Sequence, residues 1–144
     1  MVVRMDLEEL LKRGLIKRAV QSKQSAVKRI RKAEKWLNLA GRLAELDLDT
    51  ALEKAYDAIL ESGMAIMSKN GFRATSKLGH HFAVMEYLST AIDIDSSALH
   101  TLRKNRNVII YEDAEDITTD EYIDEAIKFA TDVVKKSKRL VAGK

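Results

Sequence analysis

The chain has 144 residues, of which 46% are apolar and 33% are charged, and this length and composition suit one domain with a single core. It contains no cysteine and no proline, which excludes disulfides and thiolate chemistry and removes the strongest helix breaker. Residues 1–42 hold 12 Lys and Arg against 4 Asp and Glu, whereas residues 43–144 hold 13 against 18. So basic an N-terminal part attracts polyanions or the acidic face of a partner.

The apolar runs of the sequence are short. None is long enough to form a helix that spans a bilayer, so we expect no membrane contact. Charge appears early, at Arg4 and Asp6, which argues against the apolar centre of a signal peptide. The sequence therefore predicts a cytoplasmic protein.

Apolar residues recur three and four positions apart through almost the whole chain, which is the helical spacing. Gly14 follows the first such stretch and is a typical helix stop, and Asn70-Gly71 marks a turn. Gly63 stands among small residues, so a neighbouring helix can approach closely there. The expected elements are helices over residues 6–13, 16–46, 50–67, 78–92, 96–111 and 119–141, a loop over 68–77 and an acidic connection over 112–117.

Several helix starts carry capping signals. Capping boxes are expected at Thr50 with Glu53 and at Thr118 with Glu121. The helix over residues 96–111 is expected to be capped by the residue just before it or by its first residue. Its last four residues, VIIY, resemble a strand but have no partner, so they are assigned to the helix. Five or six helices with short connections predict an all-α, antiparallel helical bundle.

One helix carries polar residues where its core-facing stripe requires an apolar one. Leu99, Leu102 and Ile109 define that stripe by their spacing. The turn between the last two must place residue 105 or 106 on the same face, and the sequence supplies Asn105 and Arg106. A guanidinium cannot lie unpaired in a dry core. This face is therefore expected to open onto a cleft, a partner subunit or a bound anion.

A polar line runs beside that stripe, formed by Arg103, Asn107 and Tyr111 at i, i+4 and i+8. Together with Arg106 these residues form the candidate ligand-binding set. The alternative is that Arg106 extends to water or pairs with an acid such as Glu86.

The stretch LRKNRNVIIY, residues 102–111, resembles the signature helix of HEPN domains. In that family an Arg, often followed by Asn or Asp, precedes a His by a few positions, and Arg106-Asn107 matches the first part. Residues 71–88, in which Gly79-His80-His81 opens a helix, resemble the region before the motif in some members. The resemblance covers about residues 45–140.

The resemblance implies a helical bundle that dimerises through its motif helices, so that two motifs face one cleft. Many HEPN proteins are metal-independent RNases that act as toxins or in phage defence, and others are partners of small nucleotidyltransferases. It implies one HEPN-like domain over residues 1–144, with a short helix within residues 1–14 and a core of about 16–141. The implied partners are a second copy of the chain, a small nucleotidyltransferase, and RNA or a nucleotide.

Tyr111 occupies the position where the family has its catalytic His. Attack by a ribose 2′-hydroxyl needs a base with a pKa near neutrality, whereas the pKa of tyrosine is about 10. A tyrosine still donates a hydrogen bond to a phosphate. The motif therefore predicts ligand binding by Arg103, Arg106, Asn107 and Tyr111 more strongly than it predicts cleavage.

The three histidines suggest little metal chemistry. His80 and His81 are adjacent, so their side chains point about 100° apart on a helix, and no third ligand is evident. We expect no metal and no cofactor, with His81 packed beside Met85 and His80 facing solvent or the loop. His100 lies one turn before Arg103 and is a weak candidate for a substitute base.

A basic stripe is expected along one face of the helix over residues 16–46, where it can follow phosphates without reading bases. The alternative is an ordinary solvated face opposite the core. The stripe consists of Lys17, Lys28, Arg31, Lys32 and Lys35.

The sequence thus predicts an RNA- or nucleotide-binding HEPN-like subunit of a toxin–antitoxin-type or nucleotidyltransferase-associated system, with weak or lost RNase activity. One alternative is an active, metal-independent HEPN endoribonuclease, with Arg106, Tyr111 and His100 as the candidate catalytic residues. A second alternative is a non-catalytic scaffold whose basic stripe docks an acidic protein.

Overall fold

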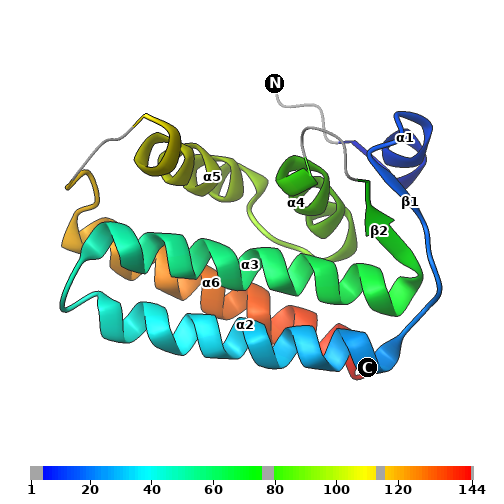
Figure 1. Ribbon diagram of the computed structural model, residues 1–144, viewed down its shortest axis with the longest axis horizontal. Coiled ribbons are helices and arrows are strands. Elements are labelled where there is room, and N and C mark those ends of the chain that lie inside the picture. The colour runs from blue at the N-terminus through cyan, green and yellow to red at the C-terminus, as the bar shows by residue number, and fades with distance from the viewer. Residues whose placement is uncertain (1–4, 76–79, 113–115, 144) are drawn as a thin grey trace.

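Three long helices form the base of the structure. In the computed structural model, which describes residues 5–75, 80–112 and 116–143, they are α2 (Lys23–Leu43), α3 (Leu48–Asn70) and α6 (Asp120–Val141). They lie side by side along the long axis, with α2 antiparallel to the other two (Figure 1). α3 packs against both neighbours and carries buried residues on most of its surface.

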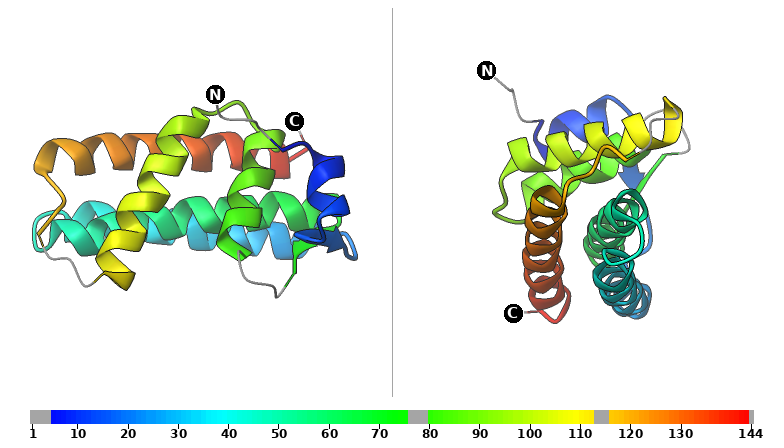
Figure 2. Two further views of the ribbon diagram at one scale, coloured as in Figure 1. Left: turned by 90° about the horizontal axis from the view of Figure 1, so that it is seen from above. Right: turned by 90° about the vertical axis from the view of Figure 1, so that its left-hand side faces the viewer.

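Shorter helices cover α3 and α6 as a second layer. α4 (His80–Ala91) and α5 (Ser96–Tyr111) cross over the long helices, whereas α2 lies on the far side of α3 (Figure 2). α1 (Leu7–Lys12) packs against α4. In the described part of the chain, six helices and one two-stranded sheet form an all-α helical bundle, as the sequence predicts.

The two-stranded sheet stands where the sequence predicts helix and loop. β1 (Ile16–Arg18) pairs antiparallel with β2 (Phe72–Ala74). The long helix therefore begins at Lys23, not at residue 16. The loop expected over residues 68–77 instead contains the end of α3, up to Asn70, and β2. Ile16, which is 1% exposed, fits either a helical stripe or a strand, and only its pairing with a distant segment decides between them.

The N-terminal caps of α3 and α6 are not the residues that the sequence predicts. Asp47 caps α3 and Thr119 caps α6, so the capping boxes expected to start at Thr50 and Thr118 are wrong. Thr118 donates its N–H and its hydroxyl to the buried Asp49 carboxylate, over 3.0 and 2.6 Å. Because this tertiary contact occupies Thr118, the next residue caps α6.

Other sequence predictions are confirmed. Asp95 caps α5, and the last four residues of α5 are helical. Gly14 and Gly71 adopt φ angles of 68° and 82° at the ends of α1 and α3, a left-handed conformation that costs glycine little. The expected start of the fourth helix at residue 78, and residues 113–115 of the acidic connection, lie outside the described residues. Within the described ranges no helix is long and apolar enough to cross a membrane.

Gly63 marks a close approach between the two layers. A Cβ added to this buried glycine would lie 2.6 Å from Cγ1 of Val84 and 3.4 Å from the Val84 carbonyl oxygen. Valine is stiff about χ1, so it cannot easily turn aside. The missing side chain of Gly63 therefore sets how closely α4 approaches α3, as the small residues of this helix predict.

We expect Gly63→Ala to lower the free energy of unfolding by about 1–3 kcal/mol, because overpacking outweighs the better helix propensity of alanine. Urea denaturation followed by circular dichroism measures the change. The matched control is Gly41→Ala in α2, where an added Cβ meets no atom within 4 Å. That variant should gain roughly 0.5–1 kcal/mol. Equal effects of the two substitutions would contradict the close approach at Gly63.

Candidate functional site

Arg106 lies on the inward face of α5, in contact with two tyrosines. Its Cζ is 5.0 Å from the ring centre of Tyr56 in α3 and 5.9 Å from that of Tyr111. Tyr56 is fully buried, whereas Tyr111 is 73% exposed. The negative faces of both aromatic rings attract the positively charged guanidinium. The neighbouring Asn105 hydrogen-bonds with Tyr122 of α6, so Arg106 is the residue that faces α3.

Within the described ranges, Arg106 uses little of its hydrogen-bonding capacity. Its Nη1 donates a long, 3.4 Å hydrogen bond to Oδ1 of Asn107, and its Nε is buried without a partner. Among the described residues Arg106 has no ion pair, because Glu86, the acid considered as its counter-ion, pairs with Nε2 of His100 at 3.4 Å. A half-buried guanidinium with unfilled donors favours a bound anion.

Arg103 adds a second positive charge one turn earlier in α5. Its Cζ lies 5.4 Å from the ring centre of Phe82 in α4. Burial raises the pKa of the Tyr56 hydroxyl, and the charges of Arg106 and Arg103 partly oppose that rise. The two guanidiniums thus act on the same buried phenol.

His81 joins the site from the first turn of α4. Its Nδ1 lies 3.4 Å from the Tyr56 hydroxyl, and the two rings are 5.8 Å apart. Burial lowers the pKa of His81, and the positive charge of Arg106 lowers it further. A histidine with a lowered pKa is neutral at pH 7 and can accept a proton.

The structure therefore assembles a group of six residues from α3, α4 and α5, which we term the Arg106 cluster. Sequence reasoning missed two of its members. Tyr56 follows the core residue Ala55 along the apolar face of α3, and no local pattern sets it apart. His81 was expected only to pack beside Met85, and its contact with Tyr56 was not predicted. The members of the Arg106 cluster are Tyr56, His81, Arg103, Arg106, Asn107 and Tyr111.

His100 is not brought into the Arg106 cluster. It contacts Glu86, a buried residue of α4, through the 3.4 Å pair already described. This placement leaves His81 as the histidine of the Arg106 cluster. His80 is exposed, as expected, and its Nδ1 lies 3.4 Å from the Thr75 carbonyl oxygen.

The basic stripe is shorter than the sequence predicts. Lys17 lies in β1, not on α2, because the helix starts later. The remaining members are exposed, and Lys32 lies 3.7 Å from a carboxylate oxygen of Glu61 in α3. α2 lies on the side of α3 away from α5, so the stripe and the Arg106 cluster are separate surfaces (Figure 1). The members on α2 are Lys28, Arg31, Lys32 and Lys35.

No group of three or more His, Asp or Glu side chains within the described residues is placed to hold a metal ion. Comparisons of the chain with protein-family models, with curated proteins and with solved structures give no match. The function is therefore inferred from the contacts and charges of the Arg106 cluster.

We expect Arg106→Gln to raise the pKa of His81 toward 6.5, because the neighbouring charge no longer repels the imidazolium. The value should stay below 6.5, since burial remains. NMR titration of the histidine ring protons measures it. Lys104→Gln, at an exposed position of the same helix, removes one charge as a control and should leave His81 unchanged. An unmoved His81 pKa in Arg106→Gln would contradict the proximity of the two side chains.

Proposed function

We propose that the protein binds RNA or a nucleotide through a phosphate held by Arg106. The observation that carries this proposal is the half-buried guanidinium, stacked on Tyr56, whose Nε has no partner. A phosphate supplies acceptor oxygens that the described residues around this Nε do not supply, and a guanidinium can bind it with two parallel hydrogen bonds. The exposed ring of Tyr111 offers a stacking surface for a base beside that phosphate.

The other members of the Arg106 cluster have supporting roles in this proposal. Arg103 contributes a second positive charge, and Asn107 orients Arg106 through its Oδ1. The exposed residues of the basic stripe on α2 add attraction for the phosphate backbone that does not depend on sequence.

The RNVIIY sequence and the helical bundle together support a HEPN-like protein. Tyr111 at the position of the motif histidine supports weak or lost RNase activity, because a phenol is a poor base near neutral pH. We therefore place the chain as a binding subunit of a toxin–antitoxin-type or nucleotidyltransferase-associated system in the cytoplasm.

Arg106→Gln should weaken binding of single-stranded RNA by roughly 1.5–3 kcal/mol, or about 10- to 150-fold in Kd, because a charge-assisted contact with phosphate is lost. Fluorescence anisotropy with a labelled oligonucleotide measures the change. Arg42→Gln, at an exposed position in the last turn of α2, removes the same charge outside the Arg106 cluster and should have little effect.

The same titration distinguishes the contribution of the basic stripe to RNA affinity from that of the Arg106 cluster. Lys28→Ala with Arg31→Ala should reduce the slope of log Kd against log salt by about 1.4, since each phosphate contact with a single strand contributes roughly 0.7. Affinity that does not depend on salt, together with an unaffected Arg106→Gln, would exclude RNA binding and favour the scaffold alternative.

We also propose that the chain forms a two-fold dimer through α4 and α5. Ile110 and Tyr111, near the end of α5, are 38% and 73% exposed, beside the half-buried Arg106. A second copy would cover this surface and bring two Arg106 clusters to one cleft. Sedimentation equilibrium at micromolar concentration should report about twice the monomer mass of 16.2 kDa. A monomer at all concentrations would reject the dimer.

Active RNase is the second candidate function, and His81 is the observation that favours it. This neutral imidazole, in contact with Tyr56 beneath Arg106, could supply the base that Tyr111 cannot. If the protein is a binding subunit, as proposed above, the wild type should cleave labelled RNA only weakly near pH 7 in the presence of EDTA. Robust cleavage that is lost in His81→Gln and kept in His100→Gln would establish the enzyme instead.

A further inference from the structure

A second group of positive charges lies beside the start of α4, outside the Arg106 cluster. There a cavity of about 100 Å³ lies where α2, α3, β2 and α4 meet. By liquid volume this is room for about three water molecules or for a phosphate group. Its polar lining comes from Arg29, Ser68, Arg73 and His80, and Phe72 forms part of its apolar wall.

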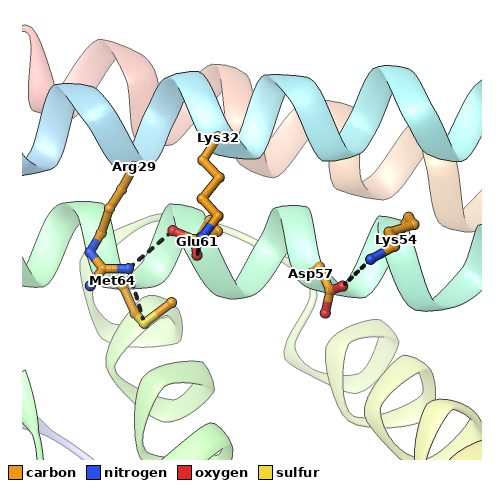
Figure 3. A network of polar contacts seen from close by, with 6 residues as sticks. All are labelled: Arg29, Lys32, Lys54, Asp57, Glu61 and Met64. Atoms are coloured by element: carbon orange, nitrogen blue, oxygen red, sulfur yellow. Dashed lines mark hydrogen bonds and ion pairs between the residues drawn. The ribbon is translucent and has the colours of Figure 1, made fainter.

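Arg29 extends from α2 to Glu61 and Met64 of α3 (Figure 3), and it lines this cavity. Its Nη1 donates to Oε2 of Glu61 over 3.1 Å and lies 3.6 Å from the Met64 sulfur, while its Nε is buried without a partner. Glu61 also lies 3.7 Å from Nζ of Lys32. One carboxylate thus faces two cations, so positive charge remains in excess on this side of the cavity.

Arg73, which lies in β2, adds to this excess of positive charge. It is exposed, and within the described ranges it takes part in no ion pair. Its strand partner is Lys17, so a further cation stands opposite it in the sheet. His80 closes the other side of the cavity from the first residue of α4. None of the described residues that line this cavity is acidic.

A chain of side-chain contacts links the cavity to the Arg106 cluster. The ring centres of His80 and His81 are 5.9 Å apart, those of His81 and Tyr56 are 5.8 Å apart, and Cζ of Arg106 lies 5.0 Å from the Tyr56 ring. The two cationic sites therefore lie on one side of α3, with two aromatic side chains between them. Successive phosphates of a nucleic-acid strand are spaced more widely than adjacent phosphates of a nucleoside triphosphate, so a strand is the better match for two separate cationic sites.

We propose that the cavity lined by Arg29, Arg73 and His80 is a second phosphate subsite, occupied by another phosphate of the RNA strand that Arg106 binds. This inference rests on the proposed function and narrows the ligand to single-stranded RNA of several nucleotides. A mononucleotide fills only the site at Arg106.

The test compares wild type with Arg73→Gln, Arg106→Gln and Arg42→Gln. Binding of adenosine monophosphate, adenosine triphosphate and ribo-oligonucleotides of two to eight nucleotides is measured by calorimetry. Arg73→Gln should weaken the binding of the longer oligonucleotides by about 5- to 20-fold, which is the scale of one charge-assisted contact near the surface. The affinity for both mononucleotides should not change. Arg106→Gln should weaken the binding of every ligand, and Arg42→Gln should bind all of them with the affinity of the wild type.

Arg73 is exposed on a short strand, so thermal unfolding should confirm that Arg73→Gln stays folded. Arg73→Lys keeps the charge and should recover most of the lost affinity. If Arg106→Gln binds every ligand as wild type does, the proposed function fails. If Arg106→Gln weakens binding while Arg73→Gln behaves like Arg42→Gln, only the second subsite fails. If Arg73→Gln weakens adenosine triphosphate as much as RNA, the subsite belongs to a free triphosphate and the RNA-strand proposal is overturned.

Discussion

The contact between α3 and α4 at Gly63 decides where the candidate ligand-binding groups lie. Because this glycine has no side chain, Val84 approaches α3 closely, and the first turn of α4 comes down on the same face. That placement brings His81 against Tyr56 and His80 to the edge of the second cavity. α5 follows α4 after a short connection and lays Arg106 on the same tyrosine. A wider spacing of the layers would separate all of these contacts.

Arg106 is the position where the bundle departs most clearly from an apolar core. Withdrawing a guanidinium from water costs free energy, and no carboxylate among the described residues offsets that cost. Stacking on Tyr56 and Tyr111 recovers part of it. A bound phosphate would recover more, since it would fill the Nε donor of Arg106, which has no partner among the described residues. Such a departure from consistent packing is typical of a functional site, where local stability is exchanged for binding.

The positive charge of the N-terminal part is divided between two surfaces. Arg29 and Lys32 turn toward Glu61 on α3, and Arg29 continues to the second cavity. Lys28 and Arg31 stay exposed on the outer side of α2 and take part in no ion pair within the described ranges. The outer surface suits long-range attraction of a polyanion, because exposed charges act through solvent. The half-buried arginines suit specific contacts, because solvent screens them less.

The sequence by itself determined the helical class, the helix end at Gly14, the turn at Gly71, and that residue 105 or 106 lies on the inward face of α5. These depend on residue spacing and on local backbone preference, which neighbours in the chain set. Only the tertiary structure decided that Ile16 pairs in a sheet, that Thr118 binds Asp49 instead of capping α6, and that His81 joins Arg106 on Tyr56 while His100 does not. Each of these outcomes is a contact between segments far apart in the chain. Periodicity along one helix cannot reveal which distant side chain will face it.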